Sequence, residues 1–223
     1  MSIVGMDAEV PPGRAVVVID VIRAFTTAAI AFARGATDIA CAASAGLGRE
    51  LRRRHPDRLL AGEVGGLKPP DFDLGNSPFE MSAALVDGRR LIQATSNGTR
   101  GLARCPEPVA LLAASAVNAG ATADWITTHH PGRPWTLLCT GRSAEDWACA
   151  RYLAGLLGGP PSSRADLIAG IRQGAADRPD LTLDLPFCED VDRFPFAMVG
   201  AVREDHVLLT RASRRSDVDK SRT

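Results

Sequence analysis

The sequence lacks an excess of charge of either sign. Among its 223 residues, 26 lysines and arginines balance 26 aspartates and glutamates, so the formal net charge is zero. A protein that binds nucleic acid or an anionic membrane surface usually carries clustered positive charge. The balance gives no support for either partner, and we expect a charged ligand to be met by local side chains.

Long apolar runs and paired cysteines are also missing. The longest apolar runs, such as residues 28–33, fall far short of the roughly 20 residues that a membrane helix needs. The five cysteines form no CxxC pair and no zinc-like spacing. No signal-peptide pattern precedes the sequon at Asn97, so we do not expect glycosylation there. These absences predict a cytoplasmic protein with reduced thiols and no membrane partner.

Common catalytic signatures are absent as well. The chain contains no GxSxG elbow and no P-loop, and none of its four histidines is placed to be the base of a catalytic triad. Cys139 ends a predicted strand, where a nucleophile could sit, although a small buried thiol more often fills a core. Triad hydrolysis and P-loop chemistry are therefore not indicated.

An α/β pattern begins near the amino terminus. Residues 16–19 are a β-branched run typical of a strand buried on both faces, and Asp20 follows it. A helix with Thr26 and Thr27 as candidate caps continues to a glycine stop at Gly35. A strand over 38–43 would complete a βαβ unit, for which a right-handed crossover is expected.

The segment 59–81 is too long for an ordinary connection and carries four glycines and three prolines. Apolar residues recur through it and are expected to anchor it to a core: Leu60, Leu67, Phe72, Leu74 and Phe79. We interpret this segment as a structured loop that binds substrate. Near its end, Ser77 and Pro78 have the pattern of a helix start, in which Glu80 could serve only as a capping residue.

The rest of the chain continues to alternate strands and helices. Strands are expected over 90–95, 109–114, 135–139, 196–202 and 206–209, the last two as a hairpin, and helices over 44–55, from 143 onward and over 164–173. The arginines of the 44–55 helix could form an anion site or could simply complement the helix dipole. The segments that start at residues 16 and 90 share one plan of strand, polar turn, helix and strand. Residues 211–223 are predicted to be a frayed polar tail.

Polar turns follow three of the predicted strands. They contain Asp20 with Arg23, the run from Thr95 to Arg100, and the run from Thr140 to Asp146. Since ligands of α/β sheets bind outside the carboxyl ends of strands, these turns predict an anion cradle, with Gly98 and Gly141 allowing close approach of the backbone. Arg23, Lys68, Arg100 and Arg142 are its candidate cations.

Several carboxylates lie in or beside the same turns: Asp20, Glu63, Asp73, Glu145 and Asp146. Carboxylates repel a phosphate unless a cation lies between them, so the set predicts magnesium and phosphoryl chemistry. Structural roles remain as alternatives. Asp146 could complete a capping box with Ser143, and Asp20 could have Arg23 as its structural partner.

The motifs that carry a family resemblance are VVVIDVIRAFTTAAIAFARGA, LLAGEVGGLKPPDFDLGNSPFE, ATSNGTRGL, SAVNA and CTGRSAEDWACA. In this order they resemble the 2-phosphosulfolactate phosphatases of the ComB type, from Val16 to about Val202. The resemblance implies a three-layer α/β fold with a mixed β-sheet. It also implies magnesium-dependent hydrolysis of (2R)-2-phospho-3-sulfolactate to 3-sulfolactate and phosphate, a step towards coenzyme M. The DxDx(T/V) signature of haloacid dehalogenase phosphatases is absent after Asp20.

The resemblance also implies roles for individual residues. The implied catalytic residues are Asp20, Arg23, Asn97 and Arg100; the substrate-binding residues are Thr26, Thr27, Glu63, Gly66, Lys68, Asn76, Ser77, Gly98 and Thr99; the magnesium ligands are Asp20, Glu145 and Asp146. The expected partner is a small anionic phosphorylated substrate, and a homo-oligomer is left open. Residues 1–210 would form one phosphatase domain, with two similar lobes, 1–125 and 126–210, sharing a cleft as the alternative.

The chain departs from the family pattern in three places. Val64 stands where the family often has arginine, Ser96 where it usually has threonine, and the turn 141–143 is shortened. Loss of a cation favours a less charged ester, so a phosphatase for another phosphorylated hydroxy acid or sugar acid is one alternative. A non-catalytic anion-binding module of the same fold is the other.

Overall fold

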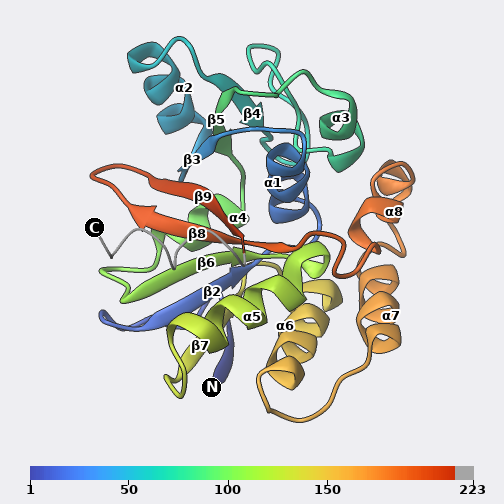
Figure 1. The fold of residues 1–223 in the computed structure, drawn as a ribbon. Helices are drawn as coiled ribbons and strands as arrows, with labels where there is room; N and C mark the ends of the chain where they lie inside the picture. Colours follow the sequence, from blue (N-terminus) through green and yellow to red (C-terminus); the bar gives the residue numbers. More distant parts are fainter. Residues whose placement is uncertain (214–223) are drawn as a thin grey trace.

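The computed structural model describes residues 1–213, which form a single nine-stranded mixed sheet with helices on both faces (Figure 1). This confirms the three-layer α/β fold. The strands are β1 (Ser2–Gly5), β2 (Ala15–Ile19), β3 (Asp38–Ala42), β4 (Leu59–Gly62), β5 (Arg90–Ala94), β6 (Ala110–Ala114), β7 (Trp135–Cys139), β8 (Phe196–Val202) and β9 (Val207–Ser213). Of the predicted polar tail, residues 211–213 belong to β9, and residues 214–223 lie outside the described part.

The strand order, β1-β7-β2-β6-β8-β9-β3-β5-β4, divides the sheet into two parallel parts. The strands β1, β7, β2 and β6 are parallel to one another, and so are β3, β5 and β4. The hairpin β8–β9 joins the two parts through three successive antiparallel pairings. The two parallel parts therefore run in opposite directions.

The expected right-handed crossover between β2 and β3 is wrong. Strands β6, β8 and β9 lie between them, and the direction reverses on the way. The chain instead crosses from one parallel part to the other through α1 (Ala24–Ala33). It crosses back from β5 to β6 through α4 (Gly98–Ala103). The two segments that share a sequence plan are thus the two crossings.

All the predicted helices are present, and the structure contains further helices that the sequence did not predict. The remaining helices are α2 (Ala45–Arg54), α3 (Pro78–Ala83), α5 (Ala119–His129), α6 (Ala144–Leu156), α7 (Arg164–Gly174) and α8 (Leu185–Cys188), with short 3-10 turns η1 (Ala116–Asn118) and η2 (Pro179–Leu181). Helices α5 and α8 and strand β1 were not predicted from the sequence. The prediction that the loop starts at residue 59 is wrong, because residues 59–62 form β4. Within residues 1–213, no helix is both long and apolar enough to cross a membrane.

Helix α1 begins earlier than expected. Its first residue is Ala24, so Thr26 and Thr27 lie inside the helix, and the prediction that they cap it is wrong. The Oδ1 atom of Asp20 accepts the backbone N–H of Ala24 at 2.9 Å. A carboxylate at the end of β2 therefore satisfies one of the free N–H groups at the start of α1.

The two faces of the sheet bury separate apolar cores. Val16 and Val18 of β2 face one core together with Phe25 and Phe32 of α1. Val17 of the same strand faces the other core, among side chains of α6 and α7. All five residues of β2 are buried, which explains its continuous apolar sequence.

The loop after β4 is ordered, but not by all the predicted anchors. Leu60 and Phe72 are buried, whereas Leu67 is 77% exposed and Phe79 is 44% exposed. Polar contacts contribute instead, since a carboxylate oxygen of Asp73 accepts the N–H of Leu60 at 2.7 Å. Leu67 was therefore wrongly predicted as an anchor.

The arginines of α2 hold this loop and do not form an anion site. Arg49 pairs with Asp71, and Arg52 pairs with Asp73. Arg54 pairs with Asp205 in the β8–β9 turn. These contacts tie the helix to its surroundings and support a structural role for these arginines.

Gly62 at the end of β4 should be required for folding. Its φ is +141°, and a Cβ there would lie 1.9 Å from the carbonyl oxygen of Ala94. The control Gly88→Ala shares a positive φ of +66° but has open space around the added atom, so strain alone should cost about 1–2 kcal/mol. Gly62→Ala should lower the free energy of unfolding by about 1–3 kcal/mol more, from overpacking. Urea denaturation of both variants checks this, and equal losses would contradict it.

Candidate active site

The carboxyl ends of strands from both parallel parts of the sheet meet at one cavity of about 540 Å³. Asp20 follows β2, Glu63 follows β4, and Asn97 lies just beyond β5. The residues that line it are Asp20, Ile22, Arg23, Glu63, Gly65, Gly66, Leu67, Asn76, Thr95, Ser96, Asn97, Arg178 and Asp180. Six residues predicted for the site are among them: Asp20, Arg23, Glu63, Gly66, Asn76 and Asn97.

Asp20 presents a buried carboxylate to this cavity. The residue is only 4% exposed, and its Oδ2 accepts the hydroxyl of Thr140 at 3.1 Å. Burial, the largest cause, raises the pKa of Asp20 from 3.8 to about 6, with smaller contributions from the charges of Glu145 and Glu63. The hydrogen bonds from Ala24 and Thr140 act in the opposite direction. Asp20 therefore holds a proton more readily than an ordinary aspartate does.

Asp146 lies directly behind Asp20. Its carboxylate accepts the backbone N–H groups of Val21 at 2.8 Å and Gly141 at 2.7 Å, and it lies 3.3 Å from the Thr140 hydroxyl. Burial, followed by the charge of Asp20, raises the pKa of Asp146. The alternative of a capping box with Ser143 is wrong, because the Ser143 side chain makes no cap hydrogen bond and donates to Glu145 instead.

Arg23 points to a carboxylate other than the predicted one. Its guanidinium donates to Asp184 at 2.7 Å and to the carbonyl of Gly66 at 3.2 Å. Asp184 also accepts the hydroxyl of Ser77 at 2.5 Å. The proposed pairing of Asp20 with Arg23 is therefore wrong, and Asp184 fixes both Arg23 and the long loop.

Four acids in or beside the cavity have no cationic partner, in contrast to Asp180, which pairs with Arg178. Within residues 1–213, no lysine, arginine or histidine forms an ion pair with Asp20, Glu63, Glu145 or Asp146. The Oε2 atom of Glu145 is buried and has no hydrogen-bond partner. Buried carboxylates without partners either bind a proton or attract a cation.

The same acids are not assembled into a complete metal cage. In the described part of the chain, no group of three or more histidine, cysteine, aspartate or glutamate side chains is arranged to hold a metal ion. Asp20 lines the cavity, whereas Glu145 and Asp146 do not. A cation here would therefore take only one or two protein carboxylates, which is the way in which magnesium is commonly held.

Glu63 and Gly98 shape the wall of the cavity. Glu63 accepts the N–H of Ser96 at 2.6 Å and that of Gly66 at 2.7 Å, so it holds the loop against the end of β5. A Cβ at Gly98 would lie 2.9 Å from Oδ2 of Asp20 and 2.8 Å from the Cβ of Ala24. Glycine is required there because α4 starts in contact with Asp20 and α1.

Other predicted site residues do not line this cavity. Thr26 donates to the carbonyl of Val21 at 2.7 Å, Thr99 accepts the N–H of Thr95 at 2.9 Å, and Ser77 caps α3. Thr27 is buried, and Lys68 is exposed on the loop. Arg100 lines a neighbouring cavity. The structure therefore gives most of these polar residues a role in holding the turns.

Four polar residues at the site were not assigned a role from the sequence. Arg178 and Asp180 line the cavity and form a bidentate pair at 2.9 and 2.8 Å. Asp184 orients Arg23, and Thr140 lies within hydrogen-bond distance of both Asp20 and Asp146. Thr140 was recognised as the first residue of a predicted polar turn, but its contact with both acids depends on the fold. The stretch 174–184 has no helical or strand periodicity, so only the fold brings it to the site.

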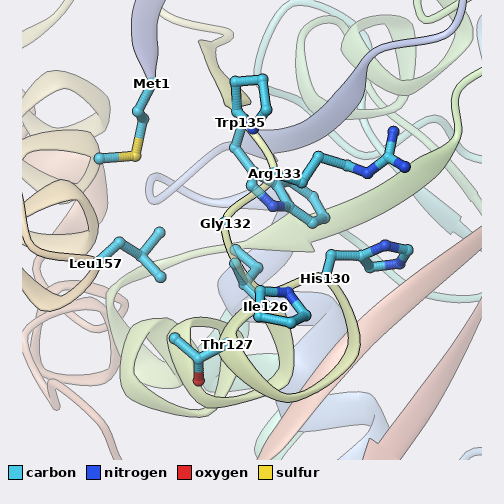
Figure 2. A pocket seen from close by; sticks show the side chains of 10 residues that line it. Met1, Ile126, Thr127, His130, Gly132, Arg133, Trp135 and Leu157 are labelled. Atoms are coloured by element: carbon cyan, nitrogen blue, oxygen red, sulfur yellow. The ribbon is translucent and has the colours of Figure 1, made fainter.

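Another cavity, of about 440 Å³, lies at the amino-terminal end of β7, away from the cavity at Asp20 (Figure 2). Ile126, His130 and Trp135 line it, and Trp135 is the first residue of that strand. None of the residues predicted for the site lies there. The acids and arginines that could act on a phosphate are at the other end of the strand.

The raised pKa of Asp20 should make the metal-free protein less stable as the pH rises. Between about pH 4 and pH 6 the folded state binds a proton at Asp20 that the unfolded state has released, so the free energy of unfolding falls across this window. The shift from 3.8 to about 6 corresponds to about 3 kcal/mol. Asp20→Asn removes this loss and should unfold at higher urea concentration than wild type at pH 8 with a chelator.

The control for this experiment is Glu9→Gln, which changes an exposed acid near the amino terminus and should follow wild type. An Asp20→Asn variant that is no more stable than wild type at pH 8, or that keeps the full slope between pH 4 and pH 6, would show that Asp20 is not destabilised by burial.

Comparison with known proteins identifies a family that this chain resembles. The family model described as 2-phosphosulpholactate phosphatase matches residues 5–176. Proteins named "Probable 2-phosphosulfolactate phosphatase" include one from Gloeothece citriformis, 39% identical over 146 residues, which are 63% of this chain and 61% of that protein. The one from Synechocystis sp. is 40% identical over the same shares. One from Synechococcus sp. (strain JA-2-3B'a(2-13)) is 34% identical over 79% of this chain and 84% of its own length.

The alignment with the first two relatives spans about three fifths of their length. The family match itself covers both turns that carry the buried acids, from Asp20 to Asp146. On this evidence the chain belongs to the 2-phosphosulpholactate phosphatase family.

Proposed function

We propose that the protein is a cytoplasmic, magnesium-dependent phosphomonoesterase that hydrolyses (2R)-2-phospho-3-sulfolactate to 3-sulfolactate and phosphate, a step towards coenzyme M. The observation that carries the proposal is the cavity in which buried Asp20 faces Arg23 and Arg178. The names of the relatives support the substrate. The fold places these groups where α/β proteins bind their ligands, at the carboxyl ends of strands.

Magnesium fits the acids of the site. Asp20 and Asp146 both approach the Thr140 hydroxyl, and neither has a cationic partner in the described residues. We propose that Asp20, with Asp146 behind it, holds the ion, while Glu145 adds negative charge. The ion would neutralise phosphate oxygens and offset the repulsion between the acids and the substrate. Its remaining ligands would be water and substrate oxygens.

The arginines supply the fixed positive charge. Arg23 is held by Asp184 and by the carbonyl of Gly66, so its guanidinium is positioned before a ligand arrives. Arg178 is similarly fixed by Asp180. Preorganised donors stabilise the charge that develops on a transferring phosphoryl group, because they need no reorientation during the reaction.

Hydrolysis needs an attacking oxygen and the transfer of one proton. Asp20 is the buried carboxylate at the cavity wall and would accept the proton of an attacking water, while the ester P–O bond breaks and the leaving oxygen takes up a proton. The carboxylate could instead attack the phosphorus and form an aspartyl phosphate, which water would then release. Trapping the aspartyl phosphate, or failing to trap it under rapid quenching, separates the two routes.

Phosphate release tests the proposal. Wild type should hydrolyse 2-phosphosulfolactate with magnesium and lose that activity in chelator, and it should act more slowly on phospholactate, phosphoglycerates and an aryl phosphate. Asp20→Asn should lower kcat at least about 100-fold, since it removes the carboxylate at the reacting centre. Glu9→Gln, at an exposed acid, is the matched control.

The same assay separates the alternatives. A preference for a less charged ester would support the proposed phosphatase chemistry with a different substrate. The valine at position 64, where the family often has arginine, favours this alternative. Failure to hydrolyse any of these esters with magnesium would contradict the proposed activity and favour a non-catalytic anion-binding module.

A further inference from the structure

A second cavity, of about 640 Å³, adjoins the first and is lined by arginines. Arg100 and Arg104 come from α4 and its carboxyl end, and Arg142 comes from the turn between β7 and α6. Two separate elements of the fold thus bring guanidinium groups to one place, next to the carboxyl ends of β1 and β7.

The positive charge of this cavity is only partly neutralised. Asp7 is the one acid that lines it, and it pairs with Arg142 at 3.2 Å with both side chains more than four-fifths exposed. A pair so exposed contributes little and is readily exchanged. Within residues 1–213, no carboxylate forms an ion pair with Arg100 or Arg104, and the nearest acceptor of Arg100 is the carbonyl of Ser96 at 3.5 Å.

Arg100 and Arg104 lie close enough to repel each other, and a bound anion would reduce this repulsion. They are four residues apart at the end of α4, where like charges repel each other across one helical turn. Basic residues near a helix carboxyl end can simply complement its dipole. The helix dipole does not account for Arg142, which lies in a different loop and lines the same cavity.

The cavity lined by Arg100, Arg104 and Arg142 (the arginine cavity) and the cavity lined by Asp20 (the acid cavity) adjoin each other. Asn97 lines both of them. Thr140 lines the arginine cavity, and its hydroxyl donates to Oδ2 of Asp20, which lines the acid cavity. A small ligand at Asp20 is therefore within a few atoms of a second, positively charged compartment.

We propose that the cavity lined by Arg100, Arg104 and Arg142 binds a second oxyanion of the substrate, a sulfonate or carboxylate, while its phosphate lies at Asp20. The inference rests on the proposed phosphatase function and names Arg104 and Arg142 as residues that determine specificity. Guanidinium groups bind such oxyanions in bidentate fashion. The valine at position 64 then matters less, since the missing positive charge is supplied from α4 and the β7–α6 turn.

The ratio of two specificity constants tests the inference. We would measure kcat/KM for 2-phosphosulfolactate, which has further oxyanions, and for phenyl phosphate, which has none, in Arg104→Gln, Arg142→Gln and the double variant. The ratio of the first constant to the second should fall at least tenfold in each single variant and further in the double one. The control Arg133→Gln changes an arginine of the distal cavity in Figure 2 and should keep the wild-type ratio. An unchanged ratio in the double variant would overturn the inference.

A binding measurement keeps the inference separate from the proposed activity. Calorimetric titration with 3-sulfolactate should show at least tenfold weaker binding in the double variant than in wild type, even if no ester is hydrolysed. Inorganic sulfate should compete with 3-sulfolactate in wild type. If the binding of sulfate depends on Arg104 but sulfate does not compete with 3-sulfolactate, the cavity binds a free oxyanion and the inference is wrong. Undiminished binding of 3-sulfolactate in the double variant would also overturn the inference. Circular dichroism confirms that the variants are folded.

Discussion

The burial of carboxylates without a cationic side chain is the constraint on which this structure depends. Asp20 and Asp146 lie close together behind one threonine hydroxyl, and burial raises the pKa of both. Backbone N–H donors from Val21, Ala24 and Gly141 form hydrogen bonds to these carboxylates and offset part of the cost of burying them. These donors stabilise the charged form only in part, which is why we propose that a cation completes the site.

The sheet is arranged so that this cluster can form. Two sets of parallel strands run in opposite directions, joined by the β8–β9 hairpin, and the chain crosses between them twice. The carboxyl ends of β2, β4 and β5 consequently reach the same cavity from opposite parts of the sheet. Arginines supply the positive charge on either side, Arg23 in the acid cavity and Arg104 in its neighbour.

Much of this could be predicted from the sequence, because local patterns specify it. The buried run before Asp20 predicted β2, and Ser77 with Pro78 predicted the start of α3. The long-range arrangement could not be predicted in the same way. A crossover between β2 and β3 is the default for neighbouring parallel strands, and only the late hairpin shows that they are not neighbours. Asp184 was missed because its role depends on contacts with Arg23 and Ser77, more than 100 residues away.

The central claim is that the buried acids at Asp20 bind magnesium by releasing a proton. Titration calorimetry of magnesium at pH 6, in two buffers of different ionisation enthalpy, measures both events at once. Since burial raises the pKa of both Asp20 and Asp146, a share of the molecules carries a proton there before the metal binds. We expect saturable binding that releases a proton at pH 6, and less proton release as the pH is raised. Absence of magnesium binding, or binding with no proton released at pH 6, would contradict it.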